Sequence, residues 1–367
     1  MHLLILSITT GQGHHQTGLA ISNYFEEHGH QVTRLDCYEY LSPTIKEMLA
    51  NGYLVSTKYS PKLYGRMYRL AEKMDQKESN SILFQVTNTI FRNKMEKFLE
   101  DTNPDVIICT HVFAALLITH IYEKGRRYPT LGIITDFKMH PYWEATDIDF
   151  YVAPNEYMIP SLVKKGIPAE RILPFGIPIF EKFSTKLPKE IAKEKLGFSN
   201  LPAILVMSGS MGFGNVYKLI KTIDSLPDDF QLVTVCGKNE KLYQKIEKNK
   251  LKHKIYNYGY VSNVDELMDA ADCIITKPGG LTVSEALSKE LPMILSKPIP
   301  GQEERNLEFL LNFGCCMKIS KTSPVDEVIA QLFMNPKKQE LMLESIRLLK
   351  KPDACKKLYE HILTLLA

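Results

Sequence analysis

The stretch DCIITKPGGLTVSEALSKELPMILSKPIPGQEERN (272–306) decides the fold class. It holds two short apolar and β-branched runs, 272–276 and 292–296, separated by a helical pattern that opens on two glycines. Nearly all residues of the two runs are apolar, as strands covered on both faces require. The stretch therefore predicts an α/β unit of parallel strands joined by helical crossovers.

The same alternation extends over the chain in two series of short strands. They are predicted at 2–8, 31–36, 105–110, 130–135 and 149–153, and again at 203–208, 230–236, 254–259, 272–276 and 292–296. We expect two Rossmann-like, doubly wound domains that face a cleft, at residues 1–178 and 201–335. A proline-containing linker is predicted at 179–200 and a helical C-terminal tail at 336–367.

Composition excludes several classes of protein. The chain has 367 residues, 44% of them hydrophobic and 24% charged, which is typical of soluble globular proteins. A net charge of +3 argues against nucleic acid as the main partner. The seven cysteines are scattered without a CxxC pair, which indicates reduced core residues in a cytosolic protein.

No targeting or spanning segment is predicted. The N-terminal run lacks the basic region of a signal peptide and is predicted to be a strand. The longest uncharged stretch, 106–122, is short of the roughly 20 residues that a spanning helix needs and contains His111 and His120.

A glycine turn with histidine follows the first predicted strand, in TTGQGHH (9–15). Gly11 and Gly13 allow a tight turn, and the helix that follows begins near His14. A helix N-terminus disfavours the cationic imidazole, so His14 is predicted to be neutral and able to accept a proton. A helix-capping histidine is the equally weighted alternative.

Two more glycine turns follow strands of the second series, in SGSMGFGN (208–215) and KPGGLTVSEAL (277–287). Their backbone amides and Lys277 suit a diphosphate, and Glu285 suits the hydroxyls of a ribose. Gln302 and Glu303 begin a further helix with side chains that suit sugar hydroxyls. Tight turns and an ordinary acidic helix start are the structural alternatives.

The segment TDFKMHPYW (135–143) supplies Asp136, His140 and Trp143 as candidate acceptor-binding residues. A lone tryptophan is more often a core residue, but this one is predicted in a loop at a strand end. The acidic residues 147 and 149 enter a strand without partner ligands, so no metal site is expected.

A basic and apolar stretch, KLYGRMYRLAEK (62–73), places Lys62, Arg66, Arg69 and Lys73 at helical spacing. Such a helix suits an anionic membrane surface, and an ordinary surface helix is the alternative.

The segments 9–14, 135–143 and 277–306, in this order and spacing, resemble the monogalactosyldiacylglycerol synthase and processive diacylglycerol glucosyltransferase family, inverting glycosyltransferases of GT-B fold. A more distant resemblance is to the peptidoglycan N-acetylglucosaminyltransferase. The resemblance implies that His14 is the catalytic base and that the segment 135–143 lies near a lipid acceptor. It implies donor binding by Gly13, Ser208, Gly209, Gly212, Tyr260, Val261, Lys277, Gly279, Gly280, Leu281, Thr282, Glu285, Gln302 and Glu303, with Tyr260 and Val261 against uracil.

The function that this resemblance implies is transfer of glucose or galactose from a UDP-sugar to diacylglycerol or glycosyldiacylglycerol, without a metal or other cofactor. A peripheral location on the inner face of the cell membrane follows from the lipid acceptor. The alternatives are a polyprenyl or soluble acceptor, a UDP-N-acetylglucosamine 2-epimerase, and a non-catalytic protein that binds nucleotide sugars. The sequence leaves the sugar and the number of sugars added open.

Overall fold

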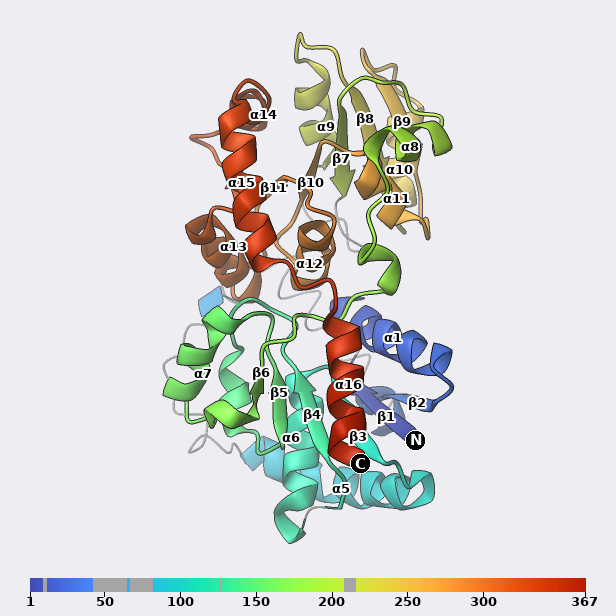
Figure 1. Ribbon diagram of the computed structural model, residues 1–367, viewed down its shortest axis with the longest axis vertical. Helices are drawn as coiled ribbons and strands as arrows, with labels where there is room; N and C mark the ends of the chain where they lie inside the picture. Colours follow the sequence, from blue (N-terminus) through green and yellow to red (C-terminus); the bar gives the residue numbers. More distant parts are fainter. Residues whose placement is uncertain (9–11, 42–64, 67–81, 126, 208–215) are drawn as a thin grey trace. The chain divides into compact units, whose positions relative to one another are not determined.

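The computed structural model describes residues 1–8, 12–41, 65–66, 82–125, 127–207 and 216–367 (Figure 1). The chain forms two compact units. Unit 1 comprises Met1–Glu181, Pro300–Gln302 and Lys351–Ala367, and unit 2 comprises Lys182–Ile299 and Glu303–Lys350.

Unit 1 is built on a sheet of six parallel strands in the order β2-β1-β3-β4-β5-β6. The strands are β1 (His2–Ser7), β2 (Gln31–Asp36), β3 (Val106–Cys109), β4 (Thr130–Ile133), β5 (Phe150–Val152) and β6 (Ile172–Leu173). Its α-helices are α1 (Gln12–Glu27), α2 (Cys37–Leu41), α5 (Ile82–Thr102), α6 (Val112–Ile121), α7 (Ile159–Lys164) and α16 (Ala354–Leu366).

Alternate residues of β1 enter two different cores, because successive side chains of a strand point to opposite faces. Leu4 and Leu6 pack in a core that includes Ile118 of α6. Leu3 and Ile5 pack in a second core that includes residues of α1 and α16. Both faces of the sheet are therefore covered by helices, which explains the nearly continuous apolar strands.

The last helix, α16, packs on unit 1. Leu358 and Ile362 of α16 share a core with Ile21 and Phe25 of α1. The preceding helix, α15 (Pro336–Leu349), ends where Lys350 turns extended, two residues before Pro352. Whereas the sequence-based division treats 336–367 as one tail, the structure assigns α15 to unit 2 and α16 to unit 1.

Unit 2 repeats the architecture with the strand order β12-β11-β10-β7-β8-β9, again all parallel. Its strands are β7 (Ala203–Met207), β8 (Gln231–Val235), β9 (Lys254–Tyr258), β10 (Cys273–Thr276), β11 (Met293–Leu295) and β12 (Cys316–Lys318). Its helices are α8 (Lys189–Lys195), α9 (Val216–Asp224), α10 (Glu240–Glu247), α11 (Val264–Ala270), α12 (Gly280–Ser288), α13 (Gln302–Phe313), α14 (Val325–Phe333) and α15.

The fold class predicted from the sequence is confirmed, and all ten predicted strands are present. The sequence analysis missed β6 and β12, which are edge strands of two and three residues and too short for a periodic signal. The residues predicted as a linker, 179–200, contain α8, and from Lys182 onward they belong to unit 2. All seven cysteines are buried free thiols, as expected.

No helix in the described ranges has the length and hydrophobicity needed to span a membrane.

Candidate active site

His14 lies in the first turn of α1, in unit 1. Its Nδ1 atom is 2.8 Å from the carbonyl oxygen of Thr110 and 2.9 Å from Oγ1 of Thr135. A carbonyl oxygen can only accept a hydrogen bond, so Nδ1 carries the proton and donates to Thr110. In the neutral ring Nε2 then has a free lone pair, which can accept a proton from a substrate hydroxyl.

Burial lowers the pKa of His14, and its hydrogen bond to Thr110 opposes this shift to a smaller extent. The sequence analysis expects a neutral imidazole because of the helix N-terminus. The structure gives desolvation as the main physical cause, because burial penalises the charged form. Either way, the base form of His14 is available at neutral pH.

A second histidine, His111, lies against His14 and was not recognised as a site residue in the sequence. The two ring centroids are 4.5 Å apart, with the rings nearly perpendicular. His111 follows β3 and caps α6, because its Nδ1 accepts a hydrogen bond from the backbone N–H of Phe113 at 3.2 Å. Burial, together with the nearby His14 and His140, holds the pKa of His111 well below its usual range. Its position directly after an apolar strand was the available signal.

The candidate acceptor segment folds over the end of β4. Asp136 and His140 are half-buried, and His140 caps a short 3₁₀ helix (Pro141–Ala145) by accepting from Tyr142 N–H at 3.3 Å. Trp143 is only 4% exposed and packs edge-on against Tyr151. The structure thus shows Trp143 as a core residue that anchors this segment, and contact with an acceptor stays a prediction.

In unit 2, β10 leads through Lys277, Pro278 and Gly279 into α12. Gly279 is the extended N-cap residue of this helix, and the space where its Cβ would lie is open. The first amides of a helix lack intrahelical acceptors. Those of α12, beginning with the predicted residues Gly280, Leu281 and Thr282, are thus suited to an anion such as a diphosphate.

The turn before α12 is held by the first residues of α13. The ammonium of Lys277 lies 2.6 Å from Oε1 of Glu303, whose Oε2 accepts from Ile299 N–H at 2.8 Å. The buried Asn306 donates to the carbonyl of Pro278 at 3.0 Å. The structure therefore brings together two residues, Lys277 and Glu303, that the sequence assigned to different parts of a donor.

Glu285 lies on α12 and is 9% exposed. Burial raises the pKa of this carboxyl to about 8; the Lys182 ammonium lowers it and Asp265 raises it further. Lys182 and Asp265 also pair with each other, at 3.1 Å. A substantial fraction of Glu285 is therefore protonated at neutral pH, and a ligand that donates hydrogen bonds to it favours the ionised form.

The other predicted residues have the following places. Gly13 is in the first turn of α1, and Gln302 is the first residue of α13. Tyr260 is 73% exposed in the loop after β9, and Val261 beside it is half-buried. Arg66 is exposed. The predicted residues Ser208, Gly209, Gly212, Lys62, Arg69 and Lys73 lie outside the described residues.

In the part of the chain that the structure describes, no three His, Cys, Asp or Glu side chains are grouped closely enough to hold a metal ion.

Two family models together cover most of the chain. Residues 14–179 match the Monogalactosyldiacylglycerol (MGDG) synthase family, and residues 203–358 match the glycosyltransferase family 28 C-terminal domain. The chain is 30% identical over 366 residues to the processive diacylglycerol beta-glucosyltransferase of Bacillus pumilus (strain SAFR-032), covering 98% of this chain and 94% of that protein. It is 33% identical over 365 residues to the protein of the same name from Bacillus cereus (strain AH187), covering 97% and 89%.

Solved structures share the fold at low sequence identity. MurG of Acinetobacter baumannii aligns with a TM-score of 0.65 and 15% identity over 99% of both chains. The UDP-GlcNAc 2-epimerase of Neisseria meningitidis, bound to UDP-GlcNAc, aligns with a TM-score of 0.60 and 15% identity over 99% of this chain and all of that one.

The ionisation of Glu285 predicts a pH-dependent stability. Its pKa in the folded protein, about 8, is above the ordinary value of 4.5. Between these values the folded state binds more protons than the unfolded state, so stability falls as pH rises, by at most about 1.4 kcal/mol per pH unit. Glu285→Gln removes this loss. In thermal denaturation from about pH 5 to about pH 9, the advantage of the variant in Tm should grow up to about pH 8 and then level off.

The matched control is Glu308→Gln, which changes an exposed carboxyl on the neighbouring helix α13. It should leave the pH profile of Tm unchanged. A Glu285→Gln advantage that is the same at every pH contradicts the assignment of a raised pKa to this carboxyl.

Proposed function

Because the chain belongs to the family of the processive diacylglycerol β-glucosyltransferases, we propose that it transfers glucose from UDP-glucose to diacylglycerol. The observation that carries the chemistry is the hydrogen bond from His14 Nδ1–H to the Thr110 carbonyl, which leaves Nε2 as the proton acceptor. Unit 1 is assigned to acceptor activation and unit 2 to donor binding. The family's printed name also supports addition of a further glucose to the first product.

In the proposed reaction, the acceptor hydroxyl donates a hydrogen bond to Nε2 of His14. The hydroxyl oxygen forms a bond to the anomeric carbon while the bond from that carbon to the diphosphate oxygen breaks. The hydroxyl proton moves to Nε2, and the bonding electron pair leaves with UDP. One displacement inverts the anomeric centre, so an α-configured donor gives a β-glucoside. The Thr110 carbonyl stabilises the imidazolium that forms.

The leaving diphosphate is proposed to bind the amides at the start of α12, where fixed dipoles stabilise the charge that develops. Lys277 adds a positive charge beside this helix start, and its ion pair with Glu303 restrains both side chains. We assign Gln302 and Glu303 to the sugar, Glu285 to the ribose hydroxyls, and Tyr260 with Val261 to the uracil. Gly13, Ser208, Gly209 and Gly212 complete the proposed donor set.

On the acceptor side, Asp136 and His140 are proposed to contact the lipid headgroup, since both are half-buried at the end of β4. The buried Trp143 is assigned to the same segment, which its indole anchors to the core.

The activity is tested by product analysis. Incubation with UDP-glucose and diacylglycerol vesicles should release UDP and yield glucosyl-diacylglycerol with a β-linkage, followed by a diglucosyl product. UDP-galactose should react more slowly. Consumption of the donor only with a polyprenyl acceptor, or binding of UDP-glucose without consumption, contradicts the proposal.

His14→Ala should lower turnover by about 10²–10⁴-fold, because the variant has no group to take the acceptor proton. UDP binding, measured by calorimetry, should remain within about twofold, since His14 is assigned to the acceptor side. The matched control is His28→Ala, an exposed histidine directly after α1, which should leave turnover unchanged. A fully active His14→Ala variant rules out the assigned base.

A lipid acceptor requires contact with a membrane, and we propose a peripheral location on its inner face. The candidate contact is the basic stretch with Lys62, Arg66, Arg69 and Lys73, of which the described residue, Arg66, is exposed. Each basic residue contributes about 1 kcal/mol near anionic headgroups.

Flotation with anionic liposomes should therefore weaken as salt rises, and Arg66→Glu should weaken it at low salt. An equally exposed lysine in unit 2, Lys248, provides the control as Lys248→Glu. Flotation that does not depend on ionic strength contradicts the electrostatic contact.

A further inference from the structure

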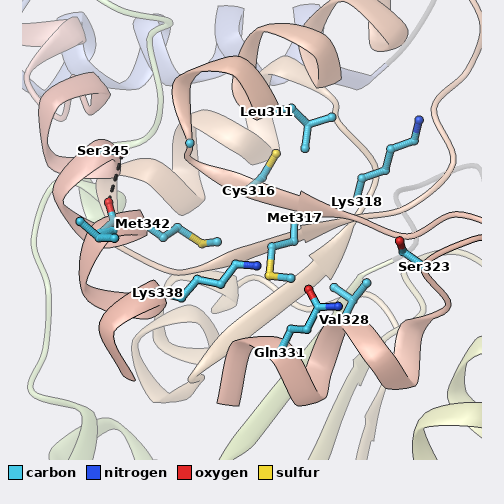
Figure 2. Close-up of a pocket in the computed structure, with 12 residues that line it drawn as sticks. Leu311, Cys316, Met317, Lys318, Ser323, Val328, Gln331, Lys338, Met342 and Ser345 are labelled. Atoms are coloured by element: carbon cyan, nitrogen blue, oxygen red, sulfur yellow. Dashed lines mark hydrogen bonds between the residues drawn. The ribbon is translucent and has the colours of Figure 1, made fainter. Parts of the chain in front are cut away.

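Unit 2 has a pocket of about 420 Å³ at the β12 edge of its sheet. It is lined by β12, α14, α15 and the end of α13 (Figure 2). Its size is within the range of about 300–1,000 Å³ that is typical of small-molecule sites. No residue assigned to the sugar donor is among those that line it, so the pocket is a separate site from the one described above.

The walls of the pocket are largely apolar. Met317 of β12 and Met342 of α15 are buried, and Val328 of α14 lies beside them. Leu311 and Leu341 at the rim are 37% and 52% exposed, which is high for leucine. Methionine side chains adapt to ligands of different shape. These walls suit a flexible aliphatic chain.

The polar groups inside the pocket are hydrogen-bond donors without a negative counterpart. Figure 2 shows the Lys338 side chain extending across the pocket toward Met317, with Gln331 on the facing helix. Ser323 supplies a hydroxyl. Among the described lining residues there is no aspartate or glutamate, and no ion pair to Lys338 is found in the described part of the chain.

The position of Lys338 on its helix makes this charge unfavourable in the empty pocket. Lys338 lies in the first turn of α15, which contains no acidic residue, and its backbone N–H donates to the Asn335 cap at 3.0 Å. A cation at the positive end of the helix dipole is destabilising. The neighbouring Lys337 is compensated by Glu340 at 2.7 Å. A bound anion would compensate Lys338 in the same way.

We propose that this pocket binds a single-chain amphiphile with a carboxylate head. The carboxylate pairs with the Lys338 ammonium and accepts hydrogen bonds from Gln331 and Ser323. The alkyl chain lies along Met317, Met342 and Leu341. The charge of Lys338 selects the anionic head, and the apolar walls distinguish this ligand from a free inorganic anion.

The test is calorimetric titration of the full chain with decanoate below its micellar concentration. Lys338→Ala should weaken binding at least about tenfold, as expected for loss of a charge-assisted hydrogen bond. Lys337→Ala, the matched control on the adjacent exposed residue, should change the affinity by less than about twofold. Gln331→Glu, which places a negative charge in the pocket, should also weaken binding. Circular dichroism of each variant establishes that it is folded.

Three outcomes would overturn the proposal. The first is equal decanoate binding by the Lys338→Ala and Lys337→Ala variants. The second is equal affinity for decanoate and for 1-decanol, which means that the head group is not recognised. The third is competition by inorganic phosphate at the same concentration as decanoate, which means that the alkyl chain contributes nothing.

Discussion

The hydrogen bond from His14 Nδ1–H to the Thr110 carbonyl is the interaction on which the proposed chemistry depends. It joins residues 96 positions apart, and the fold itself brings them together. Thr110 follows β3 directly, and its N–H donates to the Leu6 carbonyl of β1 at 3.0 Å. His14 follows β1 after one turn, so parallel pairing of β1 with β3 places the imidazole beside the carbonyl. The same packing buries the ring and lowers its pKa.

Unit 2 uses burial in the opposite sense. Desolvation keeps Glu285 largely protonated, so the energetic cost of its charged form is present before a ligand arrives. The Lys277–Glu303 ion pair and the Asn306–Pro278 hydrogen bond connect the turn before α12 to α13. A rigid turn holds the first amides of α12 in place, and preorganised dipoles are the most effective way to stabilise developing negative charge.

Most of the sheet architecture was predictable from hydrophobic pattern, because buried parallel strands are short apolar runs. The edge strands β6 and β12 were not, since two or three residues show no period. The separation of α15 from α16 was also missed, because each helix has its own apolar face and nothing local says what that face covers. Trp143 illustrates the same limit, since a tryptophan after a strand can pack inward or face a ligand, and here it packs inward.

The sequence by itself determined the two-unit parallel α/β class, the family resemblance, and the identity of His14, Glu285 and the glycine turn before α12 as candidate site residues. These depend on local pattern and on spacing along the chain. Only the tertiary structure decided that His111 lies against His14, that Lys277 pairs with Glu303, and that Lys338 extends into an apolar pocket without a carboxylate. Each of these depends on contacts between segments far apart in sequence or on burial, and a charge or tautomer follows from its neighbours in space.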